Sequence, residues 1–206
     1  MSAPGMTSPI RTETFQKMQL NAGILIKDFD YSSVTDSSTL ATAVAAAVTA
    51  GTDILGATRG GGTFTVTRDI REPEVDGLRY GFKGGKFVDS ADAYLSATLV
   101  EVTPGNIKTL LGTGTSTTSG KVTTIKMNTA IDTNDYLTNV CWIGDIAGGQ
   151  MVLICLKNAL NTADFSLTFS DKSEGTMTAE FHAHQASVSD YDKAPFEIVY
   201  FDLPAT

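Results

Sequence analysis

The chain has 206 residues, of which 42% are hydrophobic and 18% charged, a balance that excludes disorder throughout. Its formal net charge is −8, and an acidic chain is a poor candidate for clamping nucleic acid, because lysine and arginine supply the affinity for phosphates. The acidic excess lies late: residues 1–88 hold nine basic and nine acidic side chains, whereas residues 89–206 hold six and fourteen.

The N-terminal sequence does not predict a secretory signal. A charged start followed by an apolar run, as in a secretory signal, is missing, and no apolar run approaches the length of a membrane span. The two cysteines, Cys141 and Cys155, do not amount to a disulfide scaffold. We therefore expect a soluble protein, made in the cytosol, with free thiols.

The first fifty residues predict three segments. Residues 1–14 are small and polar, with two prolines, and are expected to be a flexible arm. Residues 15–29 contain a plausible strand with Ile24 and Ile26 on one side. The alanine-rich run from Leu40 to Ala50 predicts a helix, capped by one of residues 36–38 and ended by Gly51.

A half-buried strand follows the three glycines at residues 60–62. Apolar and polar side chains alternate along it, with Phe64, Val66 and Ile70 on one side. The other side carries Thr63, Thr65, Thr67 and Asp69. The glycines suit a turn or bulge, and Pro73 lacks the N–H that a ladder needs, so the strand should stop near it. Residues 74–92 are then expected to form a long, charged loop.

The rest of the chain predicts further strands and one short helix. The helix lies between Thr103, its N-cap, and Gly112, its C-cap, with Pro104 in the first position. Residues 112–120 contain only glycine, serine and threonine and are expected to be a flexible loop, after which strands resume at Lys121. The expected strands are residues 93–102, 136–143, 150–156, 165–170, 177–184 and 196–201, and the second and third of these are apolar enough to be buried on both faces. Residues 15–206 are read as one mainly β domain.

Candidate chemistry is sparse. His182 and His184 lie two apart on a strand, near Glu180, but no third metal ligand is fixed by spacing, so we interpret them as part of a polar face. The glycine clusters lack the P-loop pattern, and Gly-x-Ser-x-Gly is absent. We therefore expect no enzyme and no cofactor.

The cysteines allow two registers. If Gly148 is the centre of a three-residue loop, Cys141 faces Cys155 across a hairpin; if the turn is Gly148-Gly149 alone, Cys141 faces Leu156. Either way we interpret them as buried small apolar thiols.

Several strand faces are rich in hydroxyl groups and free of lysine. They carry Thr63, Thr65, Thr67; Ser166, Thr168, Ser170; and Thr178 with Glu180. Such a face is either an ordinary solvent face or the wall of a wet channel, where neutral and acidic groups let a polyanion pass without binding it.

The order of these segments resembles a known family. Residues 56–64, the run Arg68-Asp69-Ile70-Arg71-Glu72, the run Val75-Asp76-Gly77, Lys83-Gly84 and residues 97–104 look like the major tail protein, or tail tube protein, of long-tailed bacteriophages of Gram-positive hosts. The resemblance covers roughly residues 15–202, and the alanine-rich helix departs from the family pattern.

The resemblance implies an antiparallel β-sandwich or small barrel with a flanking short α-helix. It implies homohexameric rings that stack into a tube, a conduit for double-stranded DNA within the virion, assembled in the host cytoplasm without a membrane. Tape-measure, tail terminator and distal tail proteins would be its partners. The loop at residues 74–92 would then be an assembly arm, with candidate contacts Glu74, Asp76, Arg79, Lys83, Lys86 and Asp89. The lumen candidates are Thr63, Thr65, Thr67 and Asp69.

Two other interpretations remain open. The inner tube of a contractile tail or tail-like bacteriocin shares the fold. A carbohydrate- or protein-binding β-sandwich module is the alternative from another class, although it usually displays exposed aromatics, and the one tryptophan, Trp142, lies in an apolar strand.

Overall fold

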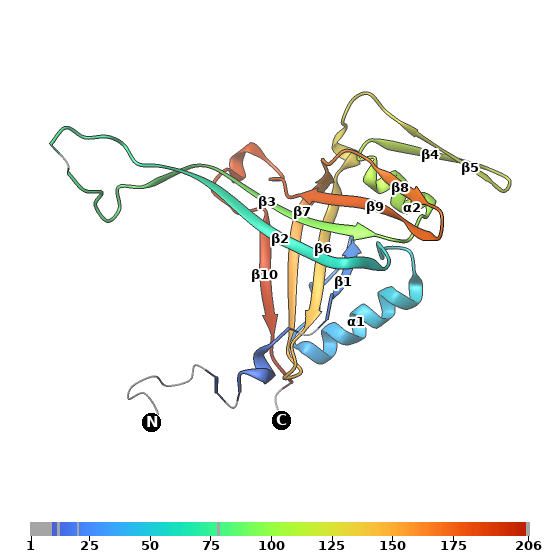
Figure 1. The fold of residues 1–206 in the computed structure, drawn as a ribbon, viewed down its shortest axis with the longest axis horizontal. Helices are drawn as coiled ribbons and strands as arrows, with labels where there is room; N and C mark the ends of the chain where they lie inside the picture. The colour runs from blue at the N-terminus through green and yellow to red at the C-terminus, as the bar shows by residue number, and fades with distance from the viewer. Residues whose placement is uncertain (1–9, 12, 20, 78, 205–206) are drawn as a thin grey trace.

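A computed structural model of the chain describes residues 10–11, 13–19, 21–77 and 79–204. Antiparallel strands dominate these residues, and two α-helices accompany them (Figure 1). The expected fold class, mainly β with a sandwich and a flanking helix, is confirmed. Most of the predicted N-terminal arm, residues 1–9 and 12, lies outside the described residues.

The first sheet has the order β1-β6-β7-β10, with every neighbouring pair antiparallel. Its strands are β1 (Ile24–Lys27), β6 (Leu137–Asp145), β7 (Met151–Asn161) and β10 (Phe196–Phe201). Both of its faces are covered, one by the second sheet and the other by a helix. This confirms the prediction that residues 136–143 and 150–156 are buried on both faces, because a strand between two layers needs apolar side chains of both parities.

The second sheet has the order β2-β3-β9-β8. Its strands are β2 (Thr58–Arg71), β3 (Phe87–Leu99), β8 (Leu167–Ser170) and β9 (Ser173–His182). The end of β7, at Leu160 and Asn161, pairs with β9, so one strand belongs to both sheets. Asn158, just before this pairing, has φ of 47°, a value that Asn tolerates better than most residues. Strands of the second sheet run across those of the first in Figure 1, as in sandwiches where a strand turns the corner.

The main core lies between the two sheets. Leu95, Leu99 and Phe181 from the second sheet pack against the first sheet, which contributes Val140 and Leu156. All five side chains are at most 5% exposed. Leu25 also points into this core, while its neighbours Ile24 and Ile26 point to the opposite side, as the alternation predicted.

The second core lies between the first sheet and α1 (Ser37–Ala50). Asp36 caps this helix through a hydrogen bond from Thr39 N to Oδ1 of 2.9 Å, and Gly51 ends it with φ of 68°. The helix therefore begins and ends as predicted. Its apolar stripe is Leu40, Ala43, Val44 and Ala47, with the 3–4 spacing of a helix that covers a surface. This stripe lies over Ile26, Cys141, Leu153 and Cys155.

The short helix α2 (Pro104–Leu110) has the predicted cap, since Thr103 Oγ1 accepts from Asn106 N at 3.1 Å. Its C-cap is Leu111 instead of the expected Gly112. Two buried asparagines attach it to the body. Asn106 donates to the carbonyl of Leu55 at 3.0 Å, and Asn161 donates to that of Leu110 at 2.8 Å. These bonds satisfy carbonyl groups that no strand or helix would pair.

One prediction was wrong outright. Residues 112–120 are not a flexible loop, because β4 (Gly114–Ser119) pairs with β5 (Val122–Met127) in a hairpin that projects from the body beside α2 (Figure 1). The two turn residues are Gly120 and Lys121, and Gly120 has the positive φ that such turns need. Threonines in β4 form a ladder as readily as a loop, since β-branched residues favour strands.

Two boundaries also differ from prediction. Residues 15–29 hold a 3₁₀ turn (Phe15–Lys17) and only a four-residue strand, β1. The loop expected at residues 74–92 is shorter, because residues 87–92 belong to β3 and continue the ladder with β2. Other 3₁₀ turns are Thr133–Asp135 and Val188–Asp190.

Candidate assembly surfaces

The outer face of the second sheet is not covered by another layer of the described chain. We call it the open face. It carries Thr63, Thr65, Thr67, Asp69, Ser90, Asp92, Tyr94, Ser96, Thr98, Thr178, Glu180 and His182. Side chains there alternate with the buried ones at Ala93, Leu95, Ala97 and Leu99. The four lumen candidates therefore lie together on one face, in adjoining rows of the ladder.

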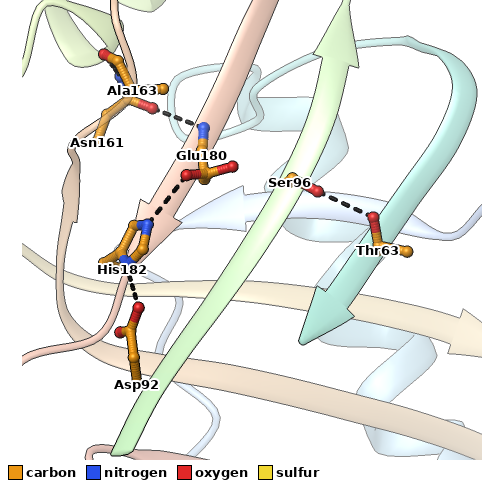
Figure 2. Close-up of polar contacts among 7 residues, drawn as sticks. All are labelled: Thr63, Asp92, Ser96, Asn161, Ala163, Glu180 and His182. Carbon is orange, nitrogen blue, oxygen red and sulfur yellow. Dashed lines mark hydrogen bonds and ion pairs between the residues drawn. The ribbon is translucent and has the colours of Figure 1, made fainter. Parts of the chain in front are cut away.

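Hydrogen bonds across the strands organise the open face. Thr63 Oγ1 and Ser96 Oγ lie 2.9 Å apart on β2 and β3 (Figure 2). Ser96 is in turn opposite Glu180 on β9. None of the open-face residues is lysine or arginine, whereas Asp69, Asp92 and Glu180 are acidic. The face therefore presents hydroxyl and carboxylate groups to whatever lies over it.

His182 lies between two carboxylates on this face. Its Nδ1 is 2.8 Å from Asp92 Oδ2, and its Nε2 is 3.1 Å from Glu180 Oε1 (Figure 2). The ring also stacks on Tyr94, with centroids 4.9 Å apart. Both ring nitrogens of His182 thus lie within hydrogen-bonding distance of a carboxylate oxygen.

His184 does not share the surroundings of His182. Its Nδ1 lies 3.2 Å from the carbonyl oxygen of Asn158, and its ring meets Tyr136 edge to face, with centroids 5.0 Å apart. No group of three or more His, Cys, Asp or Glu residues suited to a metal ion occurs in the described part of the chain.

The β2–β3 hairpin extends well beyond the sandwich (Figure 1). We call residues 66–91 the arm. Its apolar residues lack cover in the monomer: Val66, Ile70, Val75, Tyr80, Phe82, Phe87 and Val88 are all at least 39% exposed. The sequence predicted a half-buried strand here, but only Phe64 contacts the core, because β2 leaves the body after it. A run of exposed apolar side chains on a projecting hairpin marks an interaction surface.

The predicted contact residues divide into two groups. Glu74, Asp76, Arg79 and Lys83 are exposed at the tip of the arm, between the two strands. Lys86 and Asp89 instead have partners within the arm. Lys86 Nζ lies 3.9 Å from Glu72 Oε2, and Asp89 Oδ2 accepts from Arg71 Nε at 2.8 Å. Asp89 therefore lies in a strand and not in the expected loop. Its carboxylate raises the pKa of Arg71 through that hydrogen bond.

Two irregularities interrupt the β2–β3 ladder, one at the body end of β2 and one within the arm. A register shift between Thr58 and Gly62 falls on the glycines, where Gly60 and Gly61 both have φ of 77°. This is the bulge that the sequence predicted. A second shift lies between Asp69 and Ile70, next to the Arg71–Asp89 ion pair. Bulges increase local twist and redirect a strand, which suits a hairpin that must leave the sheet.

The second sheet ends in a strand with an unpaired edge, since in the described residues β2 pairs only with β3. The outer edge of β1 is partly covered by residues 53–55: Lys27 N donates to Asp53 O at 2.8 Å, and Leu55 N donates to Leu25 O at 3.1 Å. The edges of β1 and β2 flank a groove of about 200 Å³ that includes Phe64, Leu95 and Trp142. Exposed edges offer backbone N–H and C=O groups to another strand.

The projecting β4–β5 hairpin is a surface that the sequence predicted only in part, because a strand was expected from Lys121 onward but β4 was expected to be a loop. It carries exposed Val122 and Met127 together with Lys121 and Lys126, and residues 112–131 contain no acidic side chain. A serine–glycine–lysine turn between threonine-rich segments was the available signal. The glycines at residues 112 and 114 made the segment resemble a loop instead.

Comparisons with known proteins leave the class open. No family model matches the chain, and a search of curated proteins found no match either. No helix in the described ranges is both long and apolar enough to cross a membrane.

Proposed function

We propose that the chain is a structural subunit that polymerises into a tube, as in the tail tube of a long-tailed bacteriophage. Six copies would form a ring, and stacked rings would form the conduit for genome ejection from the virion. The observation that carries the proposal is the open face. It is an uncovered sheet face with hydroxyl and carboxylate groups and without lysine or arginine, next to an arm that leaves the body.

The open face suits the lumen of such a tube. DNA is a polyanion, and a wall with cationic groups would hold it through counterion release. A wall of threonine, serine and carboxylate groups repels or ignores it, so that DNA can slide. Closing the unpaired edge of β2 against a neighbouring subunit would also remove the aggregation hazard that such an edge carries.

The arm suits contacts between subunits. Its exposed apolar residues would be buried against another copy, and heterologous contacts of this kind propagate into rings and filaments. Exposed aromatic side chains occur on the arm, at Tyr80, Phe82 and Phe87, and elsewhere in the described chain, at Phe15, Phe169, Tyr191 and Tyr200. This scatter over several elements favours assembly over a carbohydrate-binding module, in which exposed aromatics gather on one face.

Negative-stain electron microscopy of the purified chain, at rising concentration and salt, tests the proposal. Hollow tubes or six-membered rings are the expected result. Dispersed monomers, even after preformed tube ends or a tail initiator complex are added, would overturn it and would direct attention to glycan binding. Co-assembly with a sheath protein around the tube would instead identify the inner tube of a contractile tail or tail-like bacteriocin.

A further inference from the structure

The two cysteines lie in the first sheet, beneath α1. Cys141 on β6 is directly opposite Cys155 on β7, which decides between the two registers left open by the sequence. Asp145 pairs with Met151, and the N–H of Ile146 bonds to the carbonyl of Gln150, so Gly148 is the centre of a three-residue loop. Both side chains point to the same side and are 0% exposed.

The hydrogen-bonding pattern shows what kind of pair they form. Asn139 O accepts from Asp28 N on the β1 side, so the backbone groups of Cys141, two residues on, also point toward β1. Lys157 N donates to Pro195 O on the β10 side, so those of Cys155 point toward β10. Neither cysteine bonds to the other strand through its backbone. They are a non-hydrogen-bonded pair, in which Cα atoms approach to about 4.5 Å.

That spacing lies within the range that a disulfide spans, about 4.4–6.8 Å between Cα atoms. Cys141 Sγ donates to Asn139 Oδ1 at 3.5 Å, and Cys155 Sγ lies 4.0 Å from the carbonyl oxygen of Leu156. The proximity of the two thiols raises the pKa of Cys141 and lowers that of Cys155.

Cys155 lies beside partly exposed side chains of β10, which makes it the first thiol that an oxidant would reach. Its neighbour on β10 is Glu197, whose side chain is 43% exposed and forms an ion pair with Lys157. Tyr31, from the irregular segment between β1 and α1, lies over this site and donates to Glu197 Oε2 at 3.1 Å. Displacement of Tyr31 would open the thiol, since segments without regular hydrogen bonding open more readily than sheets.

We propose that Cys141 and Cys155 form a reversible disulfide across the β6–β7 ladder when the protein meets a small-molecule disulfide such as oxidised glutathione. The Cys155 thiolate attacks one sulfur, forms a mixed disulfide and expels one glutathione thiolate. Cys141, as a thiolate, then attacks the Cys155 sulfur and expels the second. Two electrons pass from the cysteines to glutathione, and the two thiol protons go to the released thiolates.

The inference does not depend on tube assembly. A reducing cytosol keeps both thiols free, and the bond forms in an oxidising medium. The disulfide would join β6 and β7, the central strands of the first sheet, at a point that α1 covers. It would therefore cross-link the core without changing the surface of the protein.

The test oxidises native protein with oxidised glutathione, quenches with acid, and counts thiols by alkylation and mass spectrometry after denaturation. The expected result is loss of both thiols together, a mass 2 Da below that of the reduced chain, and a peptide that links the two cysteines. The thermal midpoint should be about 5–10 °C higher without reductant than with it. Two free thiols after treatment that converts an exposed cysteine, or adducts on one cysteine alone, would overturn the proposal.

Two variants test whether Tyr31 covers the thiols and whether the disulfide causes the change in thermal midpoint. Tyr31→Ala should speed thiol loss about tenfold, while the matched control Tyr191→Ala, at an exposed tyrosine, should leave the rate unchanged. Equal rates in both would show that Tyr31 does not cover the site. The double variant with Cys141→Ala and Cys155→Ala should have the same midpoint with and without reductant, and a residual difference would assign the shift to something other than this bond.

Discussion

Trp142 Nε1 donates a hydrogen bond of 2.9 Å to the carbonyl oxygen of Ala22 and thereby attaches the start of β1 to β6. Gly23 makes this approach possible. A Cβ atom at that position would lie 2.4 Å from Nε1, and its φ of 69° is one that side chains with a Cβ avoid.

Gly23→Ala should therefore destabilise the fold by about 2–4 kcal/mol, the sum of backbone strain and a clash. Gly120→Ala is the matched control, since Gly120 has φ of 62° and nothing within 4 Å of the added atom. It should cost only the strain, about 1–2 kcal/mol. Urea unfolding of both variants measures the difference, and equal costs would mean that the indole moves aside freely.

The position of α1 gives a second prediction. Leu40 is 0% exposed under the helix, whereas Val48 on the same helix is 50% exposed. Leu40→Ala should lower the free energy of unfolding by about 2–5 kcal/mol, because it leaves a cavity over the first sheet. Val48→Ala should change it by less than about 0.5 kcal/mol. Calorimetry that finds similar losses would contradict the docking of this helix.

The arm can be shortened without touching the sandwich. Deleting residues 79–86 removes most of its tip and should leave a folded monomer with unchanged secondary structure, because no buried core residue lies there. If the arm joins subunits, polymerisation should be lost. Deleting residues 116–125 of the β4–β5 hairpin serves as a comparison of similar size. Tubes of normal length from the shortened arm would exclude it as a required contact.

The features that could be predicted from the sequence are those set by residues close together in the chain. The caps at Asp36, Gly51 and Thr103, the bulge at residues 60–62 and the strand faces follow from residue spacing, and the structure has them where they were expected. To predict that Cys141 lies opposite Cys155, the length of the loop between the two strands must be known. The adjacent glycines at residues 148 and 149 left that length open. Contacts between residues far apart in the sequence could not be predicted from it. Asp92 and His182, for example, meet only because β3 and β9 are neighbours in the sheet.

The surfaces were predicted in part. Alternation placed Thr63, Thr65, Thr67 and Asp69 on one face, but it could not show that Val66 and Ile70 on the other face are uncovered, because cover depends on where the body ends. Strand β4, and with it the hairpin that it forms with β5, was missed because glycine, serine and threonine are common to loops and to exposed strands.

The Lys157–Glu197 ion pair predicts a pH dependence. The hydrogen bond from Lys157 lowers the pKa of Glu197 below its ordinary value. A carboxyl group with a lowered folded-state pKa contributes stability above its unfolded pKa and loses it as the pH falls through the folded one. Glu197→Gln should thus be less stable than the natural chain at pH 7, and the two should converge as the pH falls from about 5 to below 4.

The size of that effect is small, because both side chains are 43% exposed and solvent screens them. We expect less than about 1 kcal/mol at pH 7, reduced further by 0.5 M salt. Asp190→Asn, which breaks the ion pair with Lys193, is the control for a pair whose lysine is 76% exposed, and it should show a smaller change. Thermal unfolding across the pH range measures both. A gap between Glu197→Gln and the natural chain that widens toward acid would contradict the assignment.

The open face gives the prediction closest to function. Lysine at Thr63, Thr65 and Thr67 together should spare folding and assembly, because these side chains point away from the core. Six triple-lysine subunits in one ring would add eighteen positive charges to the wall, and each lysine that meets a phosphate raises affinity for DNA and its salt dependence. Genome delivery by particles with this tube should slow markedly at low salt and recover as salt rises. The control places the same three charges at Thr115, Thr117 and Ser119 on β4, where they are exposed but not on the open face. Equal delivery rates for the two triple variants would show that the open face does not line the lumen, while slow delivery by both would assign the effect to net charge alone.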